Sequence, residues 1–180
     1  LWANSPELLP ALVQMETTIC GAGNVPARLK ELAAFRTSEL NGCPYCKAAH
    51  GGNVQKLGYD SAQVAAVQER GRQNHGVFSE EEQAVLALAD EMTLDVRARP
   101  ETLKRVRELF GASGAIELMA VVSLLTVQST RGVARVEVLA ASRRSKATWV
   151  GSSAVWCRFK YCAVTGSGFD FGSYGRAGIG

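Results

Sequence analysis

The chain has 180 residues, of which 47% are hydrophobic and 21% are charged, as expected of one globular domain with its own core. Its five cysteines are an odd number, and no stretch resembles a signal peptide, which argues against a secreted scaffold held by disulfides. The net charge of +3 is unevenly distributed along the chain. Residues 143–180 hold six basic and one acidic side chain, whereas residues 1–142 hold fourteen basic and sixteen acidic side chains.

Apolar residues at helical spacing run through the first 142 residues, where strand patterns are nearly absent. Prolines, capping residues and glycines divide this region into about seven helices, and the first four are predicted at 6–20, 26–41, 44–57 and 61–71. A fifth helix begins at a capping box of Ser79 and Glu82, and a sixth begins at Pro100 and stops at Gly111. A seventh, very apolar helix runs from 113 to about 141. The predicted fold is therefore a compact all-α domain.

Residues 143–180 form a separate tail, in which glycine, aromatic and basic residues alternate without a helical period. We predict a domain boundary at residue 142 and a flexible tail with little fixed structure. A basic tail is able to contact nucleic acid or anionic lipid, but a solvated tail is the simpler interpretation, so no nucleic-acid or membrane partner is expected. The longest apolar run, 115–127, is interrupted by Glu117 and is too short to cross a bilayer, which predicts a buried helix.

Cys43, Cys46 and His50 lie three and four residues apart, so they share one face of the predicted helix 44–57. In the reducing cytoplasm, the expected compartment, a close cysteine pair is more often catalytic or metal-binding than structural. A thiolate is a nucleophile, and a neighbouring imidazole is able to take its proton. Zinc needs about four ligands, and no partner motif precedes the tail, so a reversible disulfide is favoured over a metal site or an inert pair.

Two further features bear on this candidate redox site. Glu31 lies on the preceding helix, and in an antiparallel hairpin it would be about one turn, roughly 6 Å, from His50. It would then orient the imidazole, although a solvent-facing Glu31 paired with Arg28 or Lys30 is the alternative. Which of the two thiols attacks stays open. The helix N-terminus would stabilise a thiolate at Cys43, whereas Cys46 is one turn from His50 and is able to pass its proton to the imidazole.

The pattern E-x11-C-x2-C-x3-H, from Glu31 to His50, resembles the alkylhydroperoxidase D-like branch of the carboxymuconolactone decarboxylase superfamily. The resemblance covers roughly residues 8–141, and the segments LGYD (57–60), FSEEEQAVLALADEMT (78–93) and LFGASGAIELMAVVS (109–123) also belong to it. One departure is Tyr45, which stands where the best-characterised branch has a second histidine, in C-x-H-C.

This resemblance implies a helical trimer or hexamer with peroxidase or disulfide-reductase activity. It implies that Cys46 is the peroxidatic thiol, that Cys43 resolves it, and that His50 and Glu31 relay protons. The implied substrate is an organic hydroperoxide or a small disulfide, and a thiol protein or small thiol restores the pair. Tyr45 would donate a hydrogen bond to the substrate, line its pocket or simply pack. No glycine-rich phosphate loop is present, so neither a metal nor another cofactor is expected.

Two other functions compete with this interpretation. A lactone decarboxylase-like enzyme would use His50 as an acid or base and would not need the cysteines. A non-enzymatic redox sensor or interaction module would instead rely on the tail.

Overall fold

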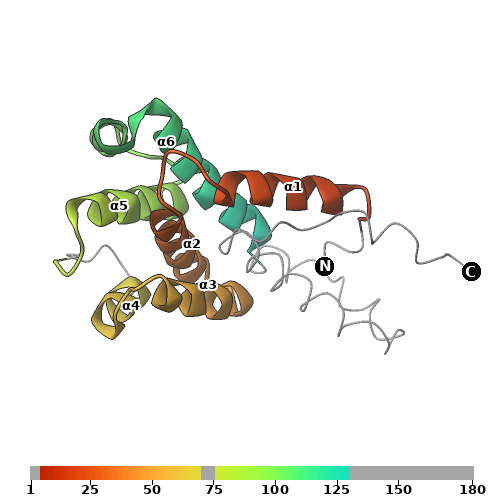
Figure 1. Cartoon of the computed structure of the whole chain (residues 1–180), viewed down its shortest axis with the longest axis horizontal. Helices are drawn as coiled ribbons and strands as arrows, with labels where there is room; N and C mark the ends of the chain where they lie inside the picture. Colours follow the sequence, from red (N-terminus) through yellow and green to blue (C-terminus); the bar gives the residue numbers. More distant parts are fainter. Residues whose placement is uncertain (1–4, 70–75, 130–180) are drawn as a thin grey trace, which may run out of the picture. The chain divides into compact units, whose positions relative to one another are not determined.

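The computed structural model describes residues 5–69 and 76–129, and within these ranges every regular element is a helix (Figure 1). The helices are α1 (Leu8–Cys20), α2 (Ala27–Asn41), α3 (Pro44–Lys56), α4 (Ser61–Gln68), α5 (Glu80–Leu94) and α6 (Pro100–Gln128). The predicted all-α class is confirmed. The boundary at residue 142 and the tail 143–180 lie outside the described residues.

Several helix ends fall at the predicted signals. Gly42 adopts a left-handed conformation (φ 64°) after α2 and donates its N–H to backbone carbonyls of the last turn, and α3 begins with Pro44 at its first position. The capping box before α5 is present, because Ser79 and Glu82 each accept a hydrogen bond from the other's backbone N–H. The α2–α3 connection is consequently a tight hairpin at the cysteine pair.

The two last predicted helices form one element, α6, with a break inside it. Gly111 has φ 73° and ψ 179°, a conformation that favours glycine and interrupts the helical backbone hydrogen bonds. The predicted stop at Gly111 is therefore present, as a kink that separates two helical segments of α6. α6 ends at Gln128, short of the predicted end near residue 141, and residues 130–141 are not described.

Helix α2 is the central element, and it packs against α3, α5 and α6. A large apolar cluster joins α2, α5 and α6, and a smaller one joins α2 to α3, α4 and α5. In the smaller cluster Phe35 is fully buried, and a Cβ added to Gly51 would lie 3.2 Å from its ring. The absence of a side chain at Gly51 lets α3 approach α2 closely next to His50.

A buried ion pair fixes α2 to α4 and α5. Arg36 is fully buried, and its Nε lies 2.5 Å from Oδ1 of Asp90 on α5. Its Nη1 donates to the carbonyl oxygens of Val67 and Glu69 at the end of α4, at 2.6 and 2.7 Å. Because every one of these bonds satisfies a buried polar atom, the guanidinium holds three helices in one arrangement.

By length and composition alone, α6 is apolar enough to cross a membrane, the one such helix among the described residues. Core helices of globular domains share this property. The second half of α6 carries fully buried residues of the large cluster, among them Leu118, Val121 and Leu124, as a core helix does.

Candidate active site

The α2–α3 hairpin brings Glu31 and His50 together. Nδ1 of His50 lies 2.7 Å from Oε1 of Glu31, and the two side chains are 7% and 15% exposed. An ionised carboxylate only accepts hydrogen bonds, so Nδ1 carries the proton and donates it. Nε2 of a neutral His50 then keeps its lone pair and is able to act as a base.

A disulfide joins Cys43 and Cys46 at the beginning of α3, with their Cα atoms 5.3 Å apart. Cys43 is the N-cap of the helix, and its Sγ accepts a hydrogen bond from the backbone N–H of Cys46 at 3.3 Å. Both residues are buried, Cys43 completely. The geometry thus allows the pair to cycle between thiols and a disulfide. His50 follows Cys46 by one helical turn.

Asn53 is a site residue that sequence reasoning missed. Its Nδ2 donates to Oε1 of Glu31 at 2.9 Å, so Glu31 receives two donors from the same face of α3. The sequence signal for Asn53 is its spacing of three residues from His50, which places it on the helix face that Cys43, Cys46 and His50 share.

A second missed feature is an ion pair that spans the cysteine loop. Oε2 of Glu39, in the last turn of α2, lies 2.7 Å from Nζ of Lys47, in the first turns of α3. The Glu39 side chain is only 6% exposed, so water screens this pair less than a surface pair. The contact braces the loop that carries Cys43 and Cys46.

Tyr45 stands between the two cysteines and is 50% exposed. It is therefore not a core residue, and its ring is accessible at the edge of the dithiol. Among the described residues, no three histidine, cysteine or acidic side chains are grouped in a way that could hold a metal ion.

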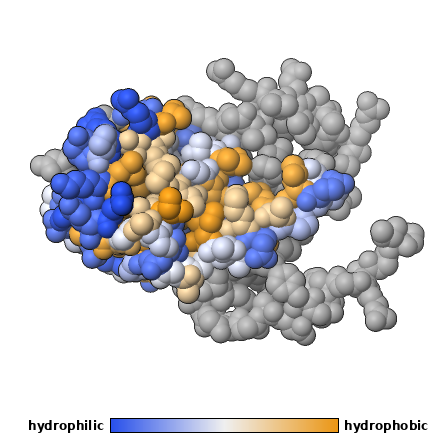
Figure 2. Space-filling view, turned by 90° about the horizontal axis from the view of Figure 1, so that it is seen from above, coloured by the Kyte–Doolittle hydropathy of each residue, from blue (hydrophilic) through white to orange (hydrophobic). Residues whose placement is uncertain are grey.

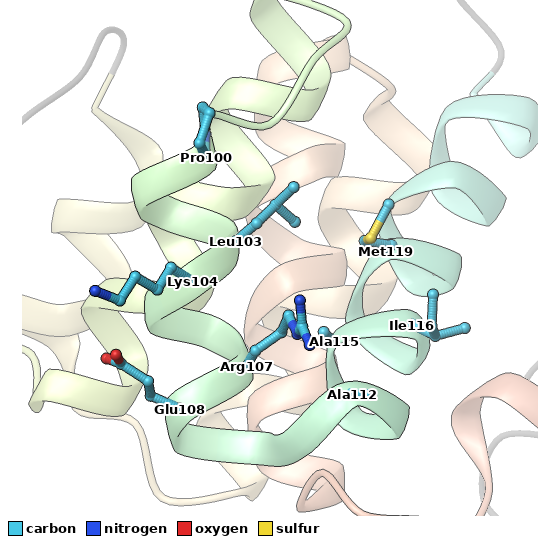
Figure 3. Close-up of a pocket in the computed structure, with 9 residues that line it drawn as sticks. All are labelled: Pro100, Leu103, Lys104, Arg107, Glu108, Ala112, Ala115, Ile116 and Met119. Carbon is cyan, nitrogen blue, oxygen red and sulfur yellow. The ribbon is translucent and has the colours of Figure 1, made fainter.

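A hollow of about 790 Å³ lies elsewhere, along α6 on both sides of its kink (Figure 3). Leu103 and Met119 lie on its apolar part, and Lys104, Arg107 and Glu108 are charged. Every residue that lines it comes from α6, whereas the cysteines, His50 and Glu31 come from α2 and α3. The hollow is consequently not the site of the dithiol.

Comparison with known proteins bears on the family and the fold. The sequence profile of the carboxymuconolactone decarboxylase family matches residues 6–91. YdfG, an uncharacterised protein of Bacillus subtilis (strain 168), is 25% identical over 121 residues, which are 66% of this chain and 80% of YdfG.

Solved structures share the fold. A protein of unknown function from Agrobacterium tumefaciens, suggested to be the antioxidant defence protein AhpD, has a TM-score of 0.64 and 20% identity over 74% of this chain and 90% of its own. The debrominase Bmp8 gives TM-scores of 0.61 in its apo form and 0.60 as a cysteine-to-alanine variant bound to 2,3,4-tribromopyrrole. These two are 22% and 21% identical and cover 73% of this chain and 70% of Bmp8.

The fold is an all-helical one of the AhpD-like type. The predicted resemblance is borne out over residues 6–91, which match the profile of the carboxymuconolactone decarboxylase family. The match to this family supports an enzyme-like role at the family level.

Proposed function

We propose that the protein is a thiol-dependent peroxidase or dithiol-disulfide oxidoreductase that reduces organic hydroperoxides. The observation that carries this proposal is the hydrogen bond from His50 to Glu31, on the same face of α3 as a closed Cys43–Cys46 disulfide. A base oriented by a carboxylate beside a reversible dithiol is the equipment that such a reaction needs.

In the proposed cycle, Nε2 of His50 takes the proton of the Cys46 thiol. The thiolate attacks one peroxide oxygen, the O–O bond breaks, and the alkoxide leaves as an alcohol with the proton from His50. Cys46 is now a sulfenic acid, and the Cys43 thiol condenses with it to form the disulfide and release water. An external dithiol then reduces the disulfide and is itself oxidised, so each turnover converts one hydroperoxide to alcohol and water.

The remaining components of the proposal follow from this chemistry. The cycle uses only the two cysteines as redox groups, so it requires neither a bound metal nor another cofactor. Half-exposed Tyr45 is a candidate contact for the hydroperoxide. We place the protein in the reducing cytoplasm, where a thiol protein or small thiol would restore the pair, and we expect a homo-oligomer and neither a nucleic-acid nor a membrane partner.

Exposed apolar residues of α6 support the proposal of a homo-oligomer. Ile116 and Val127 are 65% and 53% exposed, and Figure 2 shows hydrophobic residues gathered across the face seen from above. The hollow that Ile116 lines has both basic and acidic side chains, Arg107 and Glu108 among them, so it offers partners for either charge of a second copy. We propose that this face contacts another copy of the chain.

The alternatives make different demands on the cysteines. A decarboxylase-like reaction would use His50 as an acid or base and leave both thiols unchanged, and a redox sensor would be oxidised without turnover. Bmp8, a debrominase, shares the fold, but its substrate carries over to this chain only as a compound worth assaying.

The test is to add cumene hydroperoxide to the reduced protein and count free thiols and alcohol product. We expect two thiols per chain to disappear, the Cys43–Cys46 disulfide to form, and turnover to continue when a dithiol is supplied. Cys46→Ser should abolish turnover, whereas the matched control Cys20→Ser, which changes the described cysteine outside the disulfide, should not. If Cys43 and Cys46 stay reduced, the peroxidase proposal fails.

A further inference from the structure

We infer that Asn53 is a positioning residue of this site, which fixes the tautomer of His50 by holding the carboxylate of Glu31 in place. The inference rests on the proposed function only in so far as His50 serves as the base. It starts from one contact, the donation from Asn53 Nδ2 to Glu31 Oε1 at 2.9 Å.

Two donors from α3 converge on the same oxygen of Glu31. Nδ1 of His50 reaches it at 2.7 Å and Nδ2 of Asn53 at 2.9 Å, and the two residues are three positions apart on one helical face. A carboxylate oxygen has two lone pairs, so it is able to accept both bonds at once. The amide of Asn53 serves as a second, neutral donor and does not compete with His50 as an acid.

The second donor matters because Glu31 has a flexible side chain. Loss of the bond from Asn53 would remove one of the two α3 donors that hold Oε1, so the Glu31 side chain would gain freedom to turn away from Nδ1 of His50. With Asn53 bound as well, Oε1 is held between two groups of a rigid helix and continues to face Nδ1. In a neutral imidazole, the hydrogen bond made by one ring nitrogen decides which nitrogen carries the proton. A fixed Oε1 of Glu31 keeps the proton on Nδ1 of His50, and the lone pair therefore stays on Nε2.

The position of Asn53 inside a helix strengthens this argument. Asparagine is a poorer helix former than alanine, so Asn53→Ala should not weaken α3 through its backbone. A change in the chemistry of His50 in that variant therefore reports the lost contact with Glu31. Gln55 is the matched control, since it is an exposed amide on the same helix.

The decisive experiment measures the tautomer of His50 by long-range proton–nitrogen NMR of the oxidised, ¹⁵N-labelled protein at about pH 9, where imidazole is neutral. The chain has only two histidines, so His75→Gln assigns the signals of His50. We expect the proton on Nδ1 in the wild type and in Gln55→Ala, and a mixture with the Nε2–H tautomer in Asn53→Ala. An unchanged tautomer in Asn53→Ala overturns the inference.

A second measurement follows the consequence for the thiol. In reduced protein, Asn53→Ala should slow alkylation of Cys46 by iodoacetamide about 10-fold at neutral pH, the scale of one hydrogen bond to a charged group, while Gln55→Ala reacts like the wild type. Asn53→Asp, which keeps the size but cannot donate, should be slowed at least as much and replaces Asn53→Ala if that variant fails to fold. A wild-type rate in the folded variants counts against the inference. Neither readout uses peroxide. If the protein does not turn over peroxide but the tautomer of His50 shifts in Asn53→Ala, the peroxidase proposal is refuted and the role of Asn53 stands.

Discussion

Replacing Glu117 with glutamine should destabilise the fold in a pH-dependent manner. Glu117 on α6 accepts hydrogen bonds from the backbone and side chain of Asn24 at 2.9 and 2.8 Å, and its Oε2 lies 2.8 Å from Nζ of Lys30. Burial works against ionisation of this carboxyl, but the bonds from Lys30 and Asn24 outweigh it and lower its pKa from 4.5 to about 2. The carboxylate thus fastens the α1–α2 connection to α6.

The pKa gives the size of the effect. A fall from 4.5 to about 2, at about 1.4 kcal/mol per pKa unit, corresponds to at most about 3.5 kcal/mol of stability. The side chain is 19% exposed and partly screened, so we expect Glu117→Gln to lose about 2 kcal/mol at neutral pH. Because the folded-state pKa is lowered, this contribution is complete above about pH 4.5 and is lost as the pH falls through about 2.

Urea denaturation followed by circular dichroism provides the measurement. The difference between wild type and Glu117→Gln should be largest near neutral pH and shrink steadily below pH 4.5. Glu108→Gln is the control, because that carboxylate lies on the same helix in an exposed pair with Arg105 and should change stability by less than about 0.5 kcal/mol. A loss of equal size at neutral and acidic pH would show that shape, and not charge, explains the effect of Glu117.

Two further predictions concern the core and the assembly. Asp90→Asn leaves the fully buried Arg36 without its counter-charge and should cost about 3–5 kcal/mol in the free energy of unfolding, measured by urea denaturation; a loss below 1 kcal/mol would contradict the role given to this pair. Ile116→Glu places a charge on the exposed apolar face of α6, so light scattering should show a multiple of the 19.2 kDa chain mass for the wild type and a smaller particle for the variant. A wild type that scatters as a single chain rules out the proposed assembly.

Local signals predicted most of the helices, because each one acts within a few residues. The turn at Asn41 and Gly42 and the capping box at Ser79 are satisfied by neighbouring backbone atoms, so their sequence patterns are sufficient. Gly111 is a further local signal. A glycine there predicts a stop between two helices, and its φ of 73° breaks α6 into two helical segments.

The site was partly predictable for the same reason. The spacing of Cys43, Cys46 and His50 follows from one helix, and the hairpin argument placed Glu31 within reach of His50, as observed at 2.7 Å. Asn53 escaped notice because a polar residue within a helix is usually solvated, and only the packing of α3 on α2 gives it a partner. The packing of separate helices also decides that Arg36 pairs with Asp90, 54 residues away in the chain.

Two features of α3 favour different thiols, and the proposed cycle has a use for each. Cys46 precedes His50 by one turn, so it gains from the base when a thiol must be deprotonated to attack peroxide. Cys43 is the N-cap, where the N–H of Cys46 and the helix N-terminus stabilise a sulfur that carries negative charge. That charge develops on Cys43 when a reductant attacks Cys46 and the disulfide breaks. In the proposed cycle the helix terminus and the histidine would therefore act in opposite halves and would not compete for the same step.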